Sequence, residues 1–305
     1  MISIGRKKAE GVYMLNLLFV WLAAILWGMT GTAQTFLDNN VSPIAVATIR
    51  SAIGGGILLA ITIFWRKINF LHWSWKWTIL AAASIALFQG LFFSSIRLTG
   101  VAIGTVATIG SAPVFSGIIE WIIWRNRPSI IWGLATLIAI MGCLLLFINN
   151  GEEAVQMGGF GLALCAGLSF AFYTNISKKL MVQEDALPAV AMTFSLCTLF
   201  LLPFSLSNGF AWLENMQNLW TILFMGIMCT SVAYLLFLNG LQKINSSTAV
   251  TLSLAEPLTA AILGVFLVGE QLSGVSWLGV AMLLGSIVVL TIGGRQGRLH
   301  NKLKP

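Results

Sequence analysis

The sequence predicts an all-α integral membrane protein whose ten transmembrane helices form two inverted repeats of five helices. First, 58% of the 305 residues are hydrophobic and only 9% are charged, with a mean hydropathy of +0.90, whereas an average soluble domain has roughly 25% charged residues. Second, apolar windows close to the ~20 residues that cross the ~30 Å hydrocarbon layer recur along the chain. Third, the second half repeats the pattern of the first.

Ten apolar windows follow one another between charged and turn residues, and each predicts one spanning helix. In chain order they cover residues 14–37, 43–65, 76–96, 101–124, 129–148, 158–178, 187–206, 218–240, 247–268 and 274–292. The first window is longer than the apolar region of a normal signal peptide, so we expect it to be retained. The connections are short and leave no room for a soluble catalytic domain. We therefore expect the function to be carried out within or across the bilayer.

Positive charge marks one side of the predicted bundle. With the spans numbered in order, 15 of the 17 lysines and arginines fall on the side of the N-terminus, namely Arg6, Lys7, Lys8, Arg66, Lys67, Lys76, Arg125, Arg127, Lys178, Lys179, Lys243, Arg295, Arg298, Lys302 and Lys304. By the positive-inside rule this side faces the cytoplasm. We expect a multi-pass protein of the cell inner membrane with both termini cytoplasmic. The net charge of +7 then reflects topology, and no nucleic-acid partner is expected.

The internal similarity is clearest around two prolines. Residues 105–126 align with residues 249–270 at a shift of 144, which matches Pro113 with Pro257. Two further pairs of segments resemble each other at a spacing near 143, and these are residues 22–34 with 164–176 and residues 141–147 with 284–290.

One repeat therefore covers about five helices, and the two copies are residues 14–148 and 158–292. Because five is odd, the second copy enters the membrane from the opposite side. Two inverted copies that share a site at the membrane midplane are a common plan of transporters. Chance alignment of small and apolar residues remains the alternative interpretation of the similarity.

The repeated residues also resemble a known family. The motifs are Trp27-Gly28, the arginine in ATIRSAIGGG, the AP pair of SAPVF, the EP pair of AEPLTAAILGVFLVGE, and the MG and LG pairs that precede aliphatic runs. In this order they resemble the drug/metabolite transporter superfamily, EamA type, over about residues 14–292. The resemblance implies a central cavity lined by helices 1, 3, 4, 6, 8 and 9, and movement of small metabolites such as amino acids and amines, often outward. Family repeats often close with a GE pair, which is Gly269-Glu270 in the second half but Arg125-Asn126 in the first.

Glu256 lies near the middle of the ninth predicted span, where a charge costs about 2.5–3.5 kcal/mol on insertion scales. We expect its carboxyl to face a cavity, find a partner or carry a proton. Pro257 removes a backbone donor and frees a carbonyl near Ser253, which then needs water, a side chain or cargo. A transport role, either binding a cargo ammonium or coupling to protons, is favoured over a structural hydrogen bond.

Small and polar residues form a stripe on one face of the fourth predicted span, at Thr105, Thr108, Ala112, Ser116 and Glu120. Such a stripe suits either a cavity wall or a close helix contact. Glu120 lies nearer the cytoplasmic end, so a salt bridge to Arg125 or Arg127 is as well supported as a role in transport. Pro113 and Pro257 are expected to break helices 4 and 9 and to act in gating.

Arg50 lies within the second span and needs a carboxylate, backbone carbonyls or water as its partner. A static partner within the first repeat is favoured over a cargo carboxylate. Candidate cargo-binding residues are polar or aromatic side chains within apolar spans, namely Trp27, Gln89, Ser111, Tyr173, Asn175, Tyr234 and Glu256. Trp27 and Tyr173 occupy near-equivalent positions in the two repeats and can form an aromatic wall around cargo, although ordinary packing explains most buried tryptophans.

The sequence patterns of most enzymes and pumps are missing. The chain has no phosphate-binding glycine loop and no HExxH motif, and its four cysteines form no CxxC pair. We expect no cofactor and no metal, and a gradient as the energy source. The prediction is a secondary transporter, monomeric or homodimeric, that exports a small metabolite such as an amino acid or amine, with protons as a candidate coupling ion. The alternatives are an integral-membrane enzyme acting on a lipid or isoprenoid substrate, and a non-transporting scaffold.

Overall fold

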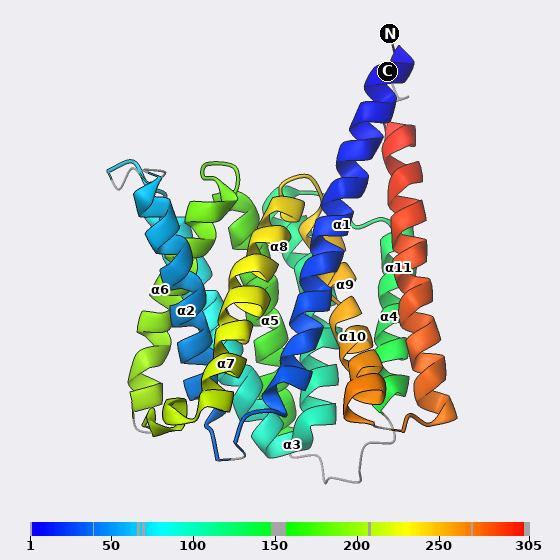
Figure 1. Cartoon of the computed structure of the whole chain (residues 1–305). Coiled ribbons are helices and arrows are strands. Elements are labelled where there is room, and N and C mark those ends of the chain that lie inside the picture. Colours follow the sequence, from blue (N-terminus) through cyan, green and yellow to red (C-terminus); the bar gives the residue numbers. More distant parts are fainter. Residues whose placement is uncertain are drawn as a thin grey trace.

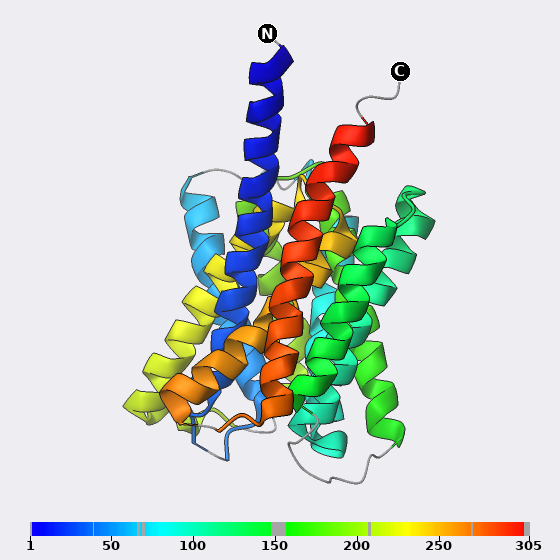
Figure 2. The ribbon, with the colours of Figure 1, turned by 90° about the vertical axis from the view of Figure 1, so that its right-hand side faces the viewer.

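The computed structural model describes residues 2–38, 40–65, 68, 71–147, 157–206, 209–269 and 271–301, and these form one helical bundle without a β-strand (Figure 1). The start of α1 and the end of α11 project beyond the same end of the bundle (Figure 2). In chain order the elements are α1 (Ile2–Gln34), α2 (Pro43–Phe64), α3 (Trp75–Trp124), α4 (Ile130–Phe147), α5 (Met157–Leu180), α6 (Ala186–Ser205), the 3₁₀ turn η2 (Ala211–Glu214), α7 (Met216–Phe224), the π-helix η3 (Met225–Val232), α8 (Ala233–Leu241), α9 (Ser246–Leu252), α10 (Ala255–Leu263), the π-helix η4 (Gly264–Val268) and α11 (Gly274–Asn301).

Nine helical segments of the described chain are long and apolar enough to cross a membrane. They are Gly11–Gln34, Pro43–Phe64, Trp75–Thr99, Gly104–Trp124, Met157–Leu180, Ala186–Ser205, Met216–Leu241, Ser246–Leu267 and Gly274–Ile292. The predicted fifth span holds a shorter apolar helix, Ile130–Leu146, whose length of about 25 Å falls just short of the ~30 Å hydrocarbon layer. The chain is therefore a multi-pass membrane protein.

Helix α3 crosses the bundle twice, although its residues are helical throughout. The rings of Trp77 and Trp124, near its two ends, lie 4.8 and 5.7 Å from the same atom, Nζ of Lys179. Both ends of α3 are therefore at one face of the bundle. A Cβ on Gly104 would lie 3.2 Å from the backbone of Ile96, whereas eight residues of a straight helix span about 12 Å. The chain thus reverses direction near Gly104, in agreement with the two windows predicted for this segment.

A π-helical turn lies inside the span that runs from α7 through η3 to α8. The hydroxyls of Thr230 and Ser231 donate to the carbonyls of Met225 and Gly226, five residues earlier, at 3.1 and 3.2 Å. Such side-chain donors help to satisfy the backbone acceptors of the wide turn, which lipid cannot do.

Helices of the two halves pack against each other crosswise. α1 packs against α8 and α10, α5 packs against α3, α2 packs against α6, and α4 packs against α11. Glycines allow the closest crossings, because a Cβ on Gly28 would lie 2.6 Å from the carbonyl oxygen of Glu256, and one on Gly167 would lie 2.6 Å from that of Thr108. Small residues of this kind let helix backbones approach each other in a membrane.

The two faces of the bundle differ in charge. The face from which α1 and α11 project also carries basic residues, among them Lys76, Arg125, Lys178, Lys179 and Lys243 (Figure 1). Asp38 and Glu214 lie at the opposite face, near the start of α7. The clustering of basic residues on one face agrees with the predicted topology, and the cytoplasmic location of that face stays a prediction.

The contact between α4 and α11 makes a testable prediction. A Cβ on Gly279 would lie 2.5 Å from the carbonyl oxygen of Gly142 and 2.6 Å from the backbone nitrogen of Leu146. Backbone cannot move aside as a side chain can, so Gly279→Ala should lower the free energy of unfolding by about 1–3 kcal/mol. A lower midpoint of thermal unfolding in detergent would report this loss.

Gly285→Ala is the matched control, because Gly285 is on the same helix and a Cβ added there would meet nothing within 4 Å. Alanine is also the better helix former, so this variant should unfold at the parental temperature or above it. Equal midpoints for the two variants would contradict the close crossing.

Candidate functional site

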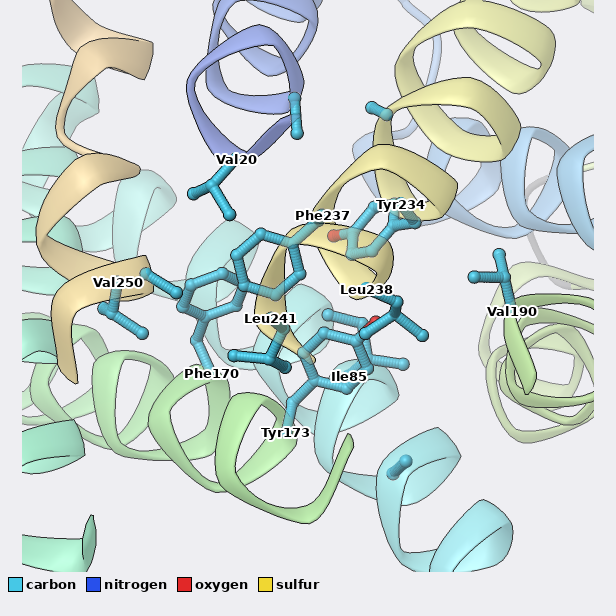
Figure 3. Packing of buried hydrophobic residues seen from close by; sticks show 14 of the residues in the cluster. Val20, Ile85, Phe170, Tyr173, Val190, Tyr234, Phe237, Leu238, Leu241 and Val250 are labelled. Carbon is cyan, nitrogen blue, oxygen red and sulfur yellow. The ribbon is translucent and has the colours of Figure 1, made fainter. Parts of the chain in front are cut away.

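Aromatic side chains meet in the middle of the bundle. Phe170 and Tyr173 of α5 face Phe237 and Tyr234 of α8 (Figure 3). The ring centroid of Trp27, on α1, lies 4.8 Å from that of Tyr234 and 5.1 Å from that of Phe237. Tyr173 lies 5.8 Å from Tyr234, so Trp27 and Tyr173 share a neighbour. With Phe194 of α6, 4.4 Å from Tyr234, these residues form what we call the aromatic cluster.

Two buried polar atoms of the bundle interior have no hydrogen-bond partner among the described residues. Nε1 of Trp27 is buried and donates to no acceptor among the described residues. Oδ1 of Asn175 is likewise buried and unbonded, although Nδ2 of the same residue donates to the hydroxyl of Ser116 at 3.1 Å. A buried polar group without a partner costs about 1–3 kcal/mol. Both atoms can therefore gain from a polar ligand or from water.

Glu256 is the second residue of α10, and its backbone carbonyl lies against Gly28 of α1. The surrounding protein desolvates its carboxylate, yet the side chain keeps part of its surface accessible. No hydrogen bond or ion pair joins this carboxylate to the residues that the structure describes. An internal charge of this kind needs a cation, a proton or water. Among the residues that the structure describes, Glu256 is thus an internal acid whose carboxylate has no protein partner.

The backbone near Glu256 differs from the prediction. The span is broken at the predicted place, since α9 ends at Leu252 and α10 begins at Ala255. The Ser253 carbonyl, however, accepts a hydrogen bond from the backbone N–H of Glu256 at 2.9 Å. A tighter 3₁₀-type turn supplies the donor that Pro257 lacks. The expectation of an unpaired carbonyl at Ser253 was therefore wrong.

Pro113 does not break its helix, because α3 continues through it. The neighbouring Ala112 packs closely on α5, where its backbone nitrogen would lie 3.3 Å from a Cβ on Gly167. A proline costs the helix one backbone hydrogen bond, and this packing keeps the two helices together at that point. The expected helix break at Pro113 is absent, and the gating roles of Pro113 and Pro257 stay predictions.

Arg50 of α2 is bonded to an amide. Its Nη2 donates to Oε1 of Gln89 at 2.9 Å, and Nε2 of Gln89 donates to Sγ of Cys197 at 3.4 Å. The Gln89 side chain is 2% exposed, so both of its polar ends are engaged by protein. Arg50 has its static partner within the first half, whereas Gln89, proposed from the sequence to bind cargo, is held by Arg50. A neutral amide leaves the positive charge uncompensated.

Arg50 and Glu256 are both close enough to Tyr234 and Cys229, in the span that contains η3 and α8, to influence these two side chains electrostatically. Arg50 also acts on Glu256 itself, and no ion pair joins the two. Two opposite charges that are not paired with each other therefore lie within electrostatic range of Tyr234, a member of the aromatic cluster.

Ser111 lies at the contact between α3 and α5. Its hydroxyl donates to the carbonyl of Thr108 at 3.2 Å and leaves no room for a Cβ on Gly167. The hydroxyl of Thr108 in turn donates to the carbonyl of Ala163 on α5 at 3.1 Å. The polar stripe of the fourth span therefore forms a close helix contact, which is one of the two predicted alternatives.

Glu120 is 2% exposed and fully bonded. Its Oε1 accepts from Nδ2 of Asn126 at 3.0 Å, and its Oε2 accepts from the backbone N–H of Ser247 at 2.9 Å. Ser247 lies in the first turn of α9, where unpaired N–H groups favour a carboxylate. These two bonds, rather than an ion pair with Arg125 or Arg127, hold the carboxylate.

Sequence reasoning missed part of the aromatic cluster. Phe170 is three residues before Tyr173, and Phe237 is three residues after Tyr234, so each shares a helical face with a residue that was predicted. That spacing was the available signal. Phe194 had no comparable signal, because its place in the cluster depends on how α6 packs.

The described residues contain no group of three His, Cys, Asp or Glu side chains that could hold a metal ion, and the four cysteines are free thiols. Glu270, which closes the GE pair of the second half, lies outside the described residues, as do Glu152 and Glu153.

Comparison with known proteins identifies the family. The model of the EamA-like transporter family matches residues 14–148 and, a second time, residues 157–292. The chain belongs to the EamA-like transporter family. This places it within the drug/metabolite transporter superfamily, as the motifs of the sequence suggested.

Relatives of this EamA-like transporter carry transporter names. The uncharacterized transporter YwfM of Bacillus subtilis (strain 168) is 40% identical over 279 residues, which cover 92% of this chain and 94% of that protein. The uncharacterized inner membrane transporter YicL of Salmonella typhimurium (strain LT2) is 27% identical, covering 93% and 96%. A solved structure titled "Crystal structure of protein" has a TM-score of 0.80 at 17% identity, covers 92% of this chain and 98% of that one, and is similar in fold.

The environment of Glu120 in this EamA-like transporter makes a second prediction. Glu120→Ala should lower the free energy of unfolding by about 1–3 kcal/mol, because it leaves the N–H of Ser247 and the amide of Asn126 without their acceptor. Glu120→Gln should lie between this variant and the parent, since an amide offers one acceptor oxygen. Thermal unfolding in detergent measures both.

Glu214→Ala is the control, because Glu214 is an exposed acid in η2. Its removal should leave the unfolding midpoint unchanged. If Glu120→Ala unfolded like this control, the capping of α9 by Glu120 would be refuted.

Proposed function

We propose that this EamA-like transporter is a secondary active transporter that exports an amino acid or amine across the cell inner membrane by alternating access. The Glu256 carboxylate carries the proposal, because it is internal, desolvated and without a hydrogen bond or ion pair to the described residues. A carboxylate in this position suits an ammonium group. The rings of Trp27 and Tyr234 favour a cation or an apolar side chain beside it.

Arg50 extends the proposal to amino acids. A guanidinium has five N–H donors, and Gln89 is the one hydrogen-bonded partner of Arg50 among the described residues. A cargo carboxylate can pair with the remaining donors, while the cargo ammonium pairs with Glu256. An amine without a carboxylate would use Glu256 alone.

The proposal includes an arrangement of ten helices in two inverted repeats, because this arrangement is suited to alternating access. The double match of one family model supports it, as does the crosswise packing of α1 on α10 and of α5 on α3. Arg125 and Gly269 give further support, because they are 144 positions apart and both take a left-handed backbone, with φ of 54° and 80°, where corresponding spans end.

Orientation and coupling complete the proposal. The basic face and both termini are cytoplasmic by the positive-inside rule. Protons are the proposed coupling ion, since a carboxylate in a desolvated site can exchange a proton for a cationic cargo. A membrane enzyme acting on a lipid or isoprenoid is the less favoured alternative, because the family and the named relatives are transporters.

Transport by purified protein in liposomes tests the function directly. Liposomes preloaded with an amino acid or amine should take up the labelled compound by counterflow, and mass analysis should recover it unchanged. Glu256→Gln should lower the rate about 10- to 100-fold, because an amide cannot replace a charge-assisted hydrogen bond to ammonium.

The matched control is Glu214→Gln at the exposed surface, which should transport like the parent. Parental transport by Glu256→Gln at every pH would rule out the role of this carboxylate. Chemical conversion of the compound without transport would favour the enzyme.

Paired substrates test the role of Arg50. Arg50→Gln should lower counterflow of an amino acid about tenfold, yet leave the corresponding decarboxylated amine close to the parental rate, because only the amino acid loses an ionic partner. An equal loss of counterflow for both compounds would instead indicate that Arg50 has a structural role.

A further inference from the structure

Two acidic residues at opposite faces of the bundle make corresponding contacts. Asp38 follows α1, which opens the first half, and Glu184 follows α5, which opens the second half. They are 146 positions apart, close to the shift of 144 that aligns Pro113 with Pro257. Each of the two carboxylates reaches a helix that belongs to the other half.

Asp38 binds the start of α7. Its Oδ2 accepts a hydrogen bond from Nδ2 of Asn218 at 2.6 Å, and its backbone N–H donates to Oδ1 of Asn218 at 3.2 Å. Nδ2 of Asn215, the N-cap of α7, lies 3.4 Å from the same carboxylate oxygen. The Asn218 side chain is fully buried. We call the pairing of Asp38 with Asn218 the outer latch.

Glu184 binds the start of α3. Its Oε1 accepts from the backbone N–H of Ser74, the N-cap of α3, at 2.9 Å. Oε1 of the adjacent Gln183 accepts from the Ser74 hydroxyl. Ser74 precedes Asn218 by 144 positions, so the partners correspond as well as the acids. We call the pairing of Glu184 with Ser74 the inner latch.

Both latches place a carboxylate at a helix N-terminus, where the helix dipole and the free N–H groups carry partial positive charge. Glu184 accepts directly from the N-cap N–H of α3, whereas Asp38 accepts from the side-chain amides of Asn218 and Asn215 at the start of α7. Each latch thereby ties the loop after the first helix of one half to the third helix of the other half. The two contacts lie at opposite faces, and both are formed in this structure.

We infer that the outer and inner latches are paired gates that hold the two faces shut and open in alternation. The inference rests on the proposed function and adds the residues that close each face. Exposure of the central site on one side requires the halves to separate there, which breaks that latch while the other stays closed. Loss of one latch should therefore shift the population of the cargo-free protein toward opening on that side.

Labelling of a cysteine in the centre of the bundle measures this shift. Tyr234→Cys, in a background with the four native cysteines replaced by serine, would be treated with a membrane-impermeant maleimide in right-side-out and in inside-out vesicles. Asp38→Ala should raise the ratio of outer to inner labelling rates about tenfold, as expected for loss of a hydrogen bond to a charged group. Glu184→Ala should lower the ratio by a similar factor, and the double variant should return near the parental ratio.

Asn218→Ala removes the other partner of the outer latch, which is the amide that binds Asp38. It should shift the ratio in the direction of Asp38→Ala, and the two changes together should not add, because they disrupt one interaction. This second variant also keeps the test valid if Asp38→Ala fails to fold.

Neighbouring acids supply matched controls. Asp185 follows Glu184 directly but makes no side-chain cap, and Glu214 is an exposed acid near Asn215. Asp185→Ala and Glu214→Ala should leave the ratio unchanged. Shifts of Asp38→Ala and Glu184→Ala in the same direction, or no shift in either, would overturn the inference.

The labelling needs no cargo, so it separates the gates from the function on which they rest. Opposed shifts without counterflow of any amino acid or amine would support the gates and reject the proposed cargo. Counterflow without opposed shifts would support the cargo and reject the gates.

Discussion

Close contact between helix backbones is the constraint on which the rest of this structure depends. Lipid is as apolar as a leucine side chain, so helices in a membrane associate through packing and hydrogen bonds rather than through hydrophobic burial. Gly28, Gly167 and Gly279 supply the crossings at which the two halves meet, and each faces backbone that a Cβ would strike. The crossing at Gly28 brings α10 against α1, and with it the backbone of Glu256 against the residue that follows Trp27.

Three charged residues within the spans show how much the local backbone decides their chemistry. Glu120 meets the N-terminus of α9 and is fully bonded, whereas Glu256 follows the break between α9 and α10, where the nearby N–H is already used by the Ser253 carbonyl. Arg50 has an amide as partner and keeps its net charge. The same residue type is thus structural in one helix and available to a ligand in another.

The two halves correspond in architecture more closely than in chemistry. Pro257 stands where its span breaks, but the matching Pro113 lies in a continuous helix packed on α5. Ala112 occupies the position of Glu256 in the first half, so the first half has no carboxylate at the place of Glu256. Under the proposed mechanism, the two halves would move in a related way around a site whose acidic group comes from the second half.

By itself the sequence predicted the all-helical membrane fold, the family and the positions of nine spanning helices. Hydropathy and motif order sufficed for this, because both are read directly from the order of residues along the chain. The sequence also singled out Glu256, since a charge at that depth is costly wherever the helix packs. The tertiary structure alone decided that Gln89 holds Arg50, that Glu120 caps α9 and that Phe194 joins the aromatic cluster. These contacts join residues that are far apart in the chain. They depend on where the helices cross and end in three dimensions, which the local sequence does not specify.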